Sequence, residues 1–100
     1  RRIFNDAQEV MNCSVKEVKG EVLVISQFTL HASAKRGNRP SYIRSAPPAI
    51  SNPMYEQFVA VLRSRYTGKI ETGIFGAMMK VNLTNDGPVT IILDSKNQDY

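Results

Sequence analysis

The feature that most constrains the fold is a turn sequence near the C-terminal end, Asn-Asp-Gly-Pro at positions 85–88. It joins two strand-like runs, residues 79–84 and 89–94, and each alternates for part of its length. In the first run Met, Val and Leu fall on one face and polar residues on the other, which is the period of a β-strand. Asn and Asp close short side-chain-to-backbone turns, and Gly accepts a positive φ, so the segment predicts a hairpin.

The proline after the turn glycine allows a second interpretation. Pro88 removes one N–H from the ladder, and proline is the only residue type before which a cis peptide bond is inexpensive. The segment is therefore either a plain hairpin loop or a recognition element in which Gly87 and Pro88 present their carbonyl oxygens in a fixed direction.

The strongest strand signal is residues 21–30, because positions 22–25 are Val-Leu-Val-Ile and such runs are typical of strands buried on both faces. Short strands are also expected at 1–4, 10–14 and 69–72, separated by polar turns at 5–9 and 16–20. Residues 31–52 form a long irregular region with three prolines, and ordered loops of this length are usually functional. A polar tail, residues 95–100, is expected to fray.

One helix is expected at about 53–66. Asn52 suits the N-cap, Pro53 suits the first helical position, and Gly68 suits the C-cap. An apolar stripe of core residues follows at helical spacing: Tyr55, Phe58, Val59, Leu62 and Tyr66. The order of elements predicts one α+β domain, residues 1–100, with a mostly antiparallel sheet.

The distribution of charge is more informative than the net charge of +4. No acidic residue occurs between Glu21 and Glu56, and four cations lie in that interval: Lys35, Arg36, Arg39 and Arg44. Such a cluster attracts polyanions, although a solvated loop would have the same composition. Few aromatic residues are interleaved with the cations, so a bound nucleic acid would be contacted at its phosphates rather than its bases.

Several classes of protein are excluded or disfavoured. No apolar run approaches the roughly 20 residues that span a bilayer, so no membrane role is expected. The single cysteine, Cys13, excludes an intrachain disulfide and favours a reducing, intracellular setting. With one histidine, His31, and no glycine-rich phosphate loop or nucleophile elbow, neither a metal nor a cofactor is expected. Any chemistry must use backbone donors, hydroxyls such as that of Thr29, and groups of the substrate.

Two segments carry a family resemblance. Residues 26–30 (SQFTL) and 85–90 (NDGPVT) are similar to the signature pair of the D-aminoacyl-tRNA deacylases, also known as D-tyrosyl-tRNA deacylases. The connecting segments 36–41, 46–48, 55–58 and 71–73 occur in the family's order. The resemblance covers nearly the whole chain and implies the family's fold, a mostly antiparallel sheet or partial barrel with one main helix.

The resemblance implies a hydrolase of translation quality control and D-amino acid catabolism. It cleaves the ester between a D-amino acid and the 3′-terminal adenosine of tRNA, in the cytoplasm, as a homodimer. In that family the Gly-Pro bond is cis and enters the partner subunit's site. The carbonyls of Gly87 and Pro88 would then accept hydrogen bonds from the substrate's α-ammonium and exclude L side chains. Glycyl-tRNA is expected to be accepted as well, because glycine has no side chain to exclude.

The resemblance also implies roles for other residues. Backbone N–H groups of Phe28 and Thr29 would stabilise the oxyanion, and Ser26 and Gln27 would shape the site. By the same resemblance, the terminal ribose 2′-OH of the substrate would position or activate water. Thr29 is disfavoured as a nucleophile, because no base is visible in the sequence to activate its hydroxyl. The remaining assignments are substrate binding by Asn85, Val89 and Thr90 and, by inference from charge, phosphate binding by Lys35, Arg36, Arg39 and Arg44.

The chain departs from the family's pattern at its start. It begins at Arg1 without Met, and the family's N-terminal strand pair and helix are expected to be missing. Residues 32–34 (ASA) replace a stretch that is often acidic, with little effect expected. Two alternatives therefore remain: a tRNA- or nucleic-acid-binding module without turnover, and a hydrolase of small activated esters with Thr29 as nucleophile.

Overall fold

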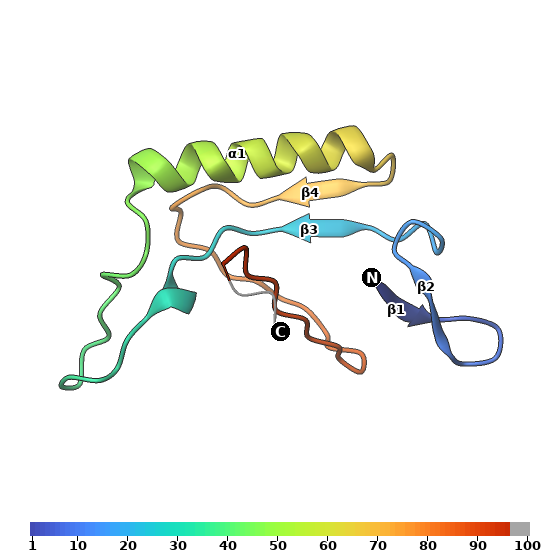
Figure 1. Cartoon of the computed structure of the whole chain (residues 1–100), viewed down its shortest axis with the longest axis horizontal. Coiled ribbons are helices and arrows are strands. Elements are labelled where there is room, and N and C mark those ends of the chain that lie inside the picture. The colour runs from blue at the N-terminus through green and yellow to red at the C-terminus, as the bar shows by residue number, and fades with distance from the viewer. Residues whose placement is uncertain (97–100) are drawn as a thin grey trace.

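A single long helix lies along one side of a short parallel strand pair, and an antiparallel hairpin lies at one end (Figure 1). This architecture is that of a computed structural model, which describes residues 1–96. The elements are β1 (Arg2–Asn5), β2 (Met11–Ser14), β3 (Val22–Val24), the 3-10 helix η1 (Thr29–His31), α1 (Pro48–Arg65) and β4 (Ile70–Thr72). The α+β class and the short strands near 1–4, 10–14 and 69–72 are confirmed.

The sheets differ from the mostly antiparallel arrangement expected. β1 and β2 pair antiparallel, but β3 and β4 pair parallel in the register Val22↔Ile70, Leu23↔Glu71 and Val24↔Thr72. The reason is that α1 lies between β3 and β4 in the sequence, and a helical crossover returns the chain in the same direction. The described residues contain two separate two-stranded sheets and no closed barrel.

The strand predicted at 21–30 is shorter and less buried than expected. β3 ends at Val24, and the side chain of Leu23 is 57% exposed, whereas Val22 and Val24 are half-buried. The prediction of burial on both faces was therefore wrong. Figure 1 shows α1 along one side of this strand pair, and the elements of residues 1–96 include no second long helix that could cover the other side.

The helix begins earlier than the Asn52–Pro53 signal predicted. α1 starts at Pro48 with Pro47 as N-cap, and the N–H groups of Ile50 and Ser51 donate to the Pro47 carbonyl at 2.9 and 3.0 Å. Pro48 is also well suited to the first helical position. Pro53, inside the helix, cannot donate to a preceding carbonyl, and α1 nevertheless continues through it.

The C-terminal cap of α1 is Tyr66 and not the predicted Gly68. Tyr66 has extended backbone geometry, and its N–H donates to the Leu62 carbonyl at 2.9 Å. Gly68 instead lies under the Tyr66 ring, which passes through the space that a β-carbon at position 68 would occupy.

The core is small. Within the described part of the chain the buried apolar side chains are Val59 and Tyr66, each 8% exposed. The Tyr66 hydroxyl donates to the Gly20 carbonyl, which ties the end of α1 to the turn before β3. Tyr55 and Leu62 are half-buried, as the predicted stripe requires, but Phe58 is 59% exposed. The sheet beside α1 has only two strands, so it is too narrow to bury every residue of the predicted stripe.

The predicted hairpin at 79–94 does not form regular strands. The two runs extend outward and back as irregular chain (Figure 1), and neither forms a ladder within residues 1–96. Leu83 and Leu93 are 68% and 74% exposed. An isolated two-stranded hairpin is marginally stable without a surface to pack on, which explains the difference. Part of the predicted tail, residues 97–100, lies outside the described residues.

The chain is extended for its length. Its Cα radius of gyration is 16.3 Å, whereas a compact domain of about 100 residues has a value near 13 Å. In residues 1–96, no helix combines the length and apolarity needed to cross a membrane.

Candidate functional site

The segment 26–29 begins where the chain leaves β3 and ends where η1 begins. Ser26 and Thr29 are half-buried, and Gln27 and Phe28 are exposed. The Gln27 side-chain amide donates a hydrogen bond to the Thr29 hydroxyl oxygen. The polar side chains that follow the strand are therefore partly satisfied by each other, close to the surface.

Two backbone donors in this segment are not used by the fold. The N–H groups of His31 and Ala32 donate to the carbonyls of Phe28 and Thr29, both at 3.1 Å, and these bonds form η1. Among the described residues, by contrast, the N–H groups of Phe28 and Thr29 donate to no other group in the chain. Consecutive free amides of this kind can bind an anion or a developing oxyanion.

The predicted basic residues lie in the loop that follows η1. An isolated bridge closes its base, with hydrogen bonds of 2.7 and 2.9 Å between Ser33 and Ser41. The Phe28 ring contacts the Tyr42 ring edge-on, at a centroid distance of 5.0 Å and an interplanar angle of 79°. The bridge closes the loop on itself, and the ring contact holds the loop beside the segment 26–29. We call residues 33–44 the basic loop.

The cations of the basic loop face solvent. Lys35, Arg36 and Arg39 lie between the two bridging serines, Arg44 follows them, and all four are exposed. In the part of the chain that the structure describes, none of them forms an ion pair; the salt bridge present joins Lys69 and Glu71 elsewhere, at 3.7 Å. Their charge therefore remains available to a polyanion.

Gly87 and Pro88 lie at the outer turn of segment 79–94. Their peptide bond is cis, and Gly87 has a φ of +106°. Asn85, Val89 and Thr90, which flank them, are exposed. Figure 1 shows that this turn points away from η1 and the basic loop. The structure therefore brings the segment 26–29 and the basic residues together, but it does not bring Gly87 and Pro88 to them within one chain.

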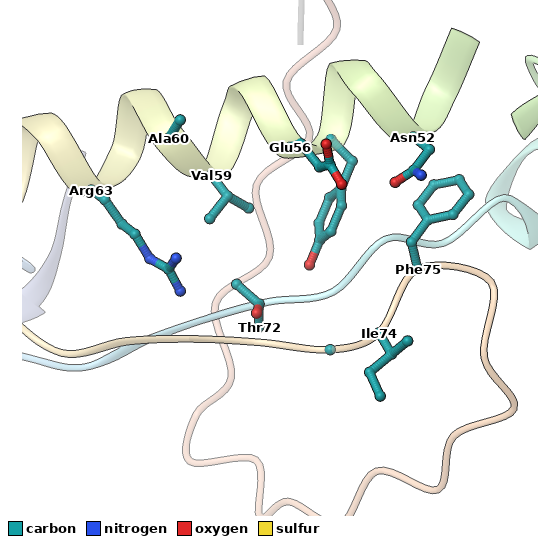
Figure 2. A pocket seen from close by; sticks show the side chains of 10 residues that line it. Asn52, Glu56, Val59, Ala60, Arg63, Thr72, Ile74 and Phe75 are labelled. Carbon is teal, nitrogen blue, oxygen red and sulfur yellow. The ribbon is translucent and has the colours of Figure 1, made fainter. Parts of the chain in front are cut away.

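A cleft that the sequence patterns did not predict lies between α1 and the chain that follows β4. Its volume is about 440 Å³, and it is lined by Asn52, Tyr55, Glu56, Val59, Ala60, Arg63, Thr72, Gly73, Ile74 and Phe75 (Figure 2). Helical periodicity assigns this side of α1 to core packing alone. A signal was nevertheless present, since segments 55–58 and 71–73 are both among those that resemble the family.

Metal ligation has no support from the side-chain arrangement. In residues 1–96, no three His, Cys, Asp or Glu side chains are grouped so that they could hold a metal ion. The groups that the candidate site offers are amide donors, hydroxyls, cations and carbonyl oxygens.

Comparison with known proteins agrees with the motifs. The model of the family described as D-Tyr-tRNA(Tyr) deacylase matches residues 1–94. A protein of Flavobacterium johnsoniae named D-aminoacyl-tRNA deacylase is 63% identical over 98 residues, which cover 98% of this chain and 65% of that protein. A protein of Bacteroides thetaiotaomicron with the same name is 64% identical over 99 residues, again 98% of this chain and 65% of the relative.

The chain thus spans 65% of the length of these curated relatives. Within that span the family match includes the segment 26–29, the basic loop and the Gly87–Pro88 turn. The chain belongs to the D-Tyr-tRNA(Tyr) deacylase family.

Proposed function

We propose that this chain hydrolyses the ester bond of D-aminoacyl-tRNA, and of glycyl-tRNA, releasing the free amino acid and tRNA. The observation that carries the proposal is the pair of N–H groups at Phe28 and Thr29, which have no acceptor within residues 1–96 and lie next to an exposed basic loop. Relatives that match nearly the whole chain are named D-aminoacyl-tRNA deacylases. The proposed reaction takes place in the cytoplasm, where translation uses aminoacylated tRNA.

The chemistry proposed is oxyanion stabilisation without a protein nucleophile. Attack of water on the ester carbonyl places negative charge on its oxygen, and the amides of Phe28 and Thr29 donate to that oxygen. The Thr29 hydroxyl is bonded by Gln27, and within residues 1–96 no carboxylate or imidazole contacts it as a base. The terminal ribose 2′-OH of the substrate therefore positions or activates the water, while Ser26 and Gln27 shape the site.

Stereochemical selection is assigned to the Gly87–Pro88 turn of a second copy in a homodimer. This turn is remote from the segment 26–29 within one chain, so a shared site requires a turn from another copy. Its two carbonyl oxygens would accept hydrogen bonds from the α-ammonium of the substrate. A D side chain then points to open space and an L side chain meets the loop, so L substrates are excluded by collision. Asn85, Val89 and Thr90 support this contact.

The basic loop is assigned to the acceptor end of tRNA. Its four cations would contact backbone phosphates, which contribute affinity but carry no sequence information. The loop follows η1 directly, so phosphates bound there place the 3′ end near the free amides.

The test compares a D-aminoacyl-tRNA, its L-counterpart and a D-aminoacyl-tRNA with a 2′-deoxy terminal adenosine. Hydrolysis of the D form alone, lost with the 2′-deoxy end, is the expected result. Thr29→Ala is expected to keep substantial activity, whereas loss of activity would favour Thr29 as nucleophile. A folded, dimeric sample that binds tRNA but hydrolyses none of the substrates would overturn the proposal and leave a binding module.

A further inference from the structure

The carbonyl oxygen of Val24, the last residue of β3, accepts two hydrogen bonds from different elements. The Tyr55 hydroxyl, from α1, donates to it at 3.2 Å. The N–H of Gly73, immediately after β4, donates to it at the same distance, 3.2 Å. Three separated parts of the chain therefore meet at the residue from which β3 leads into the segment 26–29.

Tyr55 is itself held in place. It is half-buried, it lines the cleft beneath α1, and its ring lies 6.0 Å from that of Phe75 with an interplanar angle of 39°. A tyrosine ring fixed by packing and by its hydroxyl has little rotational freedom, so its oxygen is a fixed reference point for the backbone it contacts.

We propose that Tyr55 is a positioning residue for the segment 26–29. By holding the Val24 carbonyl, it sets the direction in which the chain leaves β3, and with it the orientation of the free amides of Phe28 and Thr29. In this role Tyr55 acts through the backbone of β3. This inference rests on the proposed function, in which the amides of Phe28 and Thr29 stabilise the oxyanion.

The local contacts explain why this support matters. The amides of Phe28 and Thr29 have no acceptor in the described chain, so no hydrogen bond of their own fixes their direction. The segment is held by η1 on its C-terminal side and by Val24 on its N-terminal side. A small rotation at Val24 moves the amides relative to the developing oxyanion, and such donors act only when their geometry is preorganised.

Tyr66, the C-cap of α1, provides a matched control, because its hydroxyl makes the same kind of contact as that of Tyr55 in the middle of the helix. Its hydroxyl donates to the Gly20 carbonyl, in the turn before β3, and its ring is more deeply buried than that of Tyr55. Tyr55→Phe and Tyr66→Phe each remove one hydroxyl and its hydrogen bonding to the backbone. A role in stability alone would affect both variants similarly, whereas a positioning role distinguishes them.

The experiment measures deacylation of D-aminoacyl-tRNA and the backbone amide order parameters of residues 26–29 in this chain and both variants. For Tyr55→Phe we expect kcat to fall about threefold to tenfold with KM changed by less than about twofold. The order parameters of residues 26–29 should fall from near 0.85 toward about 0.6. Tyr66→Phe should lower the melting temperature and leave kcat and these order parameters unchanged.

Equal kcat and equal order parameters in Tyr55→Phe and the unsubstituted chain would overturn the inference, as would an equal loss of kcat in both variants. If the unsubstituted chain hydrolyses no substrate, the proposed function fails instead. The order parameters then decide the positioning role by themselves, because they require no turnover.

Discussion

The strand–helix layer and segment 79–94 differ in how they are held. In the first, β3 and β4 form a strand ladder, α1 and its C-cap contribute the two buried side chains, and the hydroxyls of Tyr55 and Tyr66 donate to backbone carbonyls. In the second, apolar side chains are exposed and the two runs have no ladder between them in residues 1–96. Each region carries one of the two signature motifs, residues 26–30 in the first and residues 85–90 in the second. The two motifs are therefore supported by different kinds of structure.

This difference separates two functions within the proposed mechanism. The packed layer carries the amides that meet the oxyanion, and these must be preorganised before the substrate arrives. Segment 79–94 carries the Gly87–Pro88 turn, which acts on a second copy in the proposed dimer. An element that is completed by a partner can be loosely held in the single chain, because association supplies its missing contacts.

The largest expected effect is on the packed layer. Tyr66→Ala removes a ring that is 8% exposed, and deletion of a buried aromatic side chain typically costs about 3–5 kcal/mol. A domain has about 5–15 kcal/mol in total, so the variant should lose a large part of its stability and unfold at a markedly lower temperature. Far-ultraviolet circular dichroism during thermal unfolding, which reports the helix content, measures this.

Tyr42→Ala is the control for this change, because Tyr42 is 38% exposed and lies in the basic loop. It should keep the helical signal and a cooperative melting transition. A melting curve for Tyr66→Ala that matched that of Tyr42→Ala would show that the packed layer does not depend on its buried tyrosine.

The second prediction concerns the turn of segment 79–94. Gly87 has a φ of +106°, a conformation that an L side chain rarely adopts, although a β-carbon there would meet only the Val89 nitrogen, at 3.7 Å. Gly87→Ala should therefore cost about 1–3 kcal/mol of local backbone strain, and D-aminoacyl-tRNA deacylation should fall by about ten- to a hundredfold. The melting temperature of the packed layer should be unchanged. Steady-state deacylation and thermal unfolding measure the two effects.

Gly76→Ala is the matched control, since Gly76 has a φ of +72° and a β-carbon there meets nothing within 4 Å. It carries similar strain outside the signature turn and should keep nearly full activity. Equal losses in both variants would mean that Gly87 acts through general folding and has no specific role at the site.

The fold as a whole also shows what sequence patterns can predict. The helix, the short strands and the turn at 5–9 follow from local spacing and local turn chemistry, and they are present. The parallel pairing of β3 with β4 was missed because the strand signals carry no direction, although the helix between them implies a crossover. The start of α1 was misplaced because Pro48 and Pro53 are both acceptable near a helix N-terminus.

The candidate site was predictable to the extent that it is local. Residues 26–29 are consecutive, and the basic loop follows them, so their proximity needed no knowledge of packing. The position of Gly87 relative to Thr29 depends on how distant segments are arranged, which alternation within 79–94 does not report. The cleft beneath α1 was missed for the same reason, because its walls come from a helix and from the chain after a strand.

A smaller effect is expected from a pair of leucine substitutions that compares the two regions directly. Leu62 is half-buried in α1, and Leu83 is 68% exposed in segment 79–94. Leu62→Ala should lower the free energy of unfolding by about 2 kcal/mol, and Leu83→Ala by less than about 0.5 kcal/mol. Urea denaturation of both variants at one low protein concentration measures the difference.

Repeating the Leu83→Ala measurement at higher protein concentration extends the comparison. In the proposed dimer a second copy covers apolar surface of this segment, so the cost of Leu83→Ala should rise with concentration while that of Leu62→Ala stays constant. A cost above about 1 kcal/mol at low concentration would show that segment 79–94 is packed within the single chain.

The smallest expected effect is confined to the β1–β2 turn, which lies outside both regions. The pKa of Asp6 is lowered below its ordinary value of 3.8, first by the Val10 N–H, then by the Asn12 side-chain amide and the Gln8 N–H. These donors lie 3.0, 3.0 and 2.9 Å from its carboxylate oxygens. Because the folded pKa is below the unfolded one, the stabilisation is fully present above about pH 4 and is lost as the pH falls through the folded pKa.

Amide chemical shifts of Gln8 and Val10, followed from about pH 7 down to about pH 2, should therefore move together only in the acidic part of this range. Asp6→Asn removes the titrating group and should abolish that transition, while Asp86→Asn, in the Gly87–Pro88 turn, should leave it unchanged. Order in segments 22–24 and 48–65 should be the same in both variants, because the turn's hydrogen bonds are local to 6–12. A transition that also moved the amides of α1 would show that the β1–β2 hairpin and the packed layer unfold as one unit. Segment 79–94 would then be the one region, among those compared, that is held separately from the rest of the described chain.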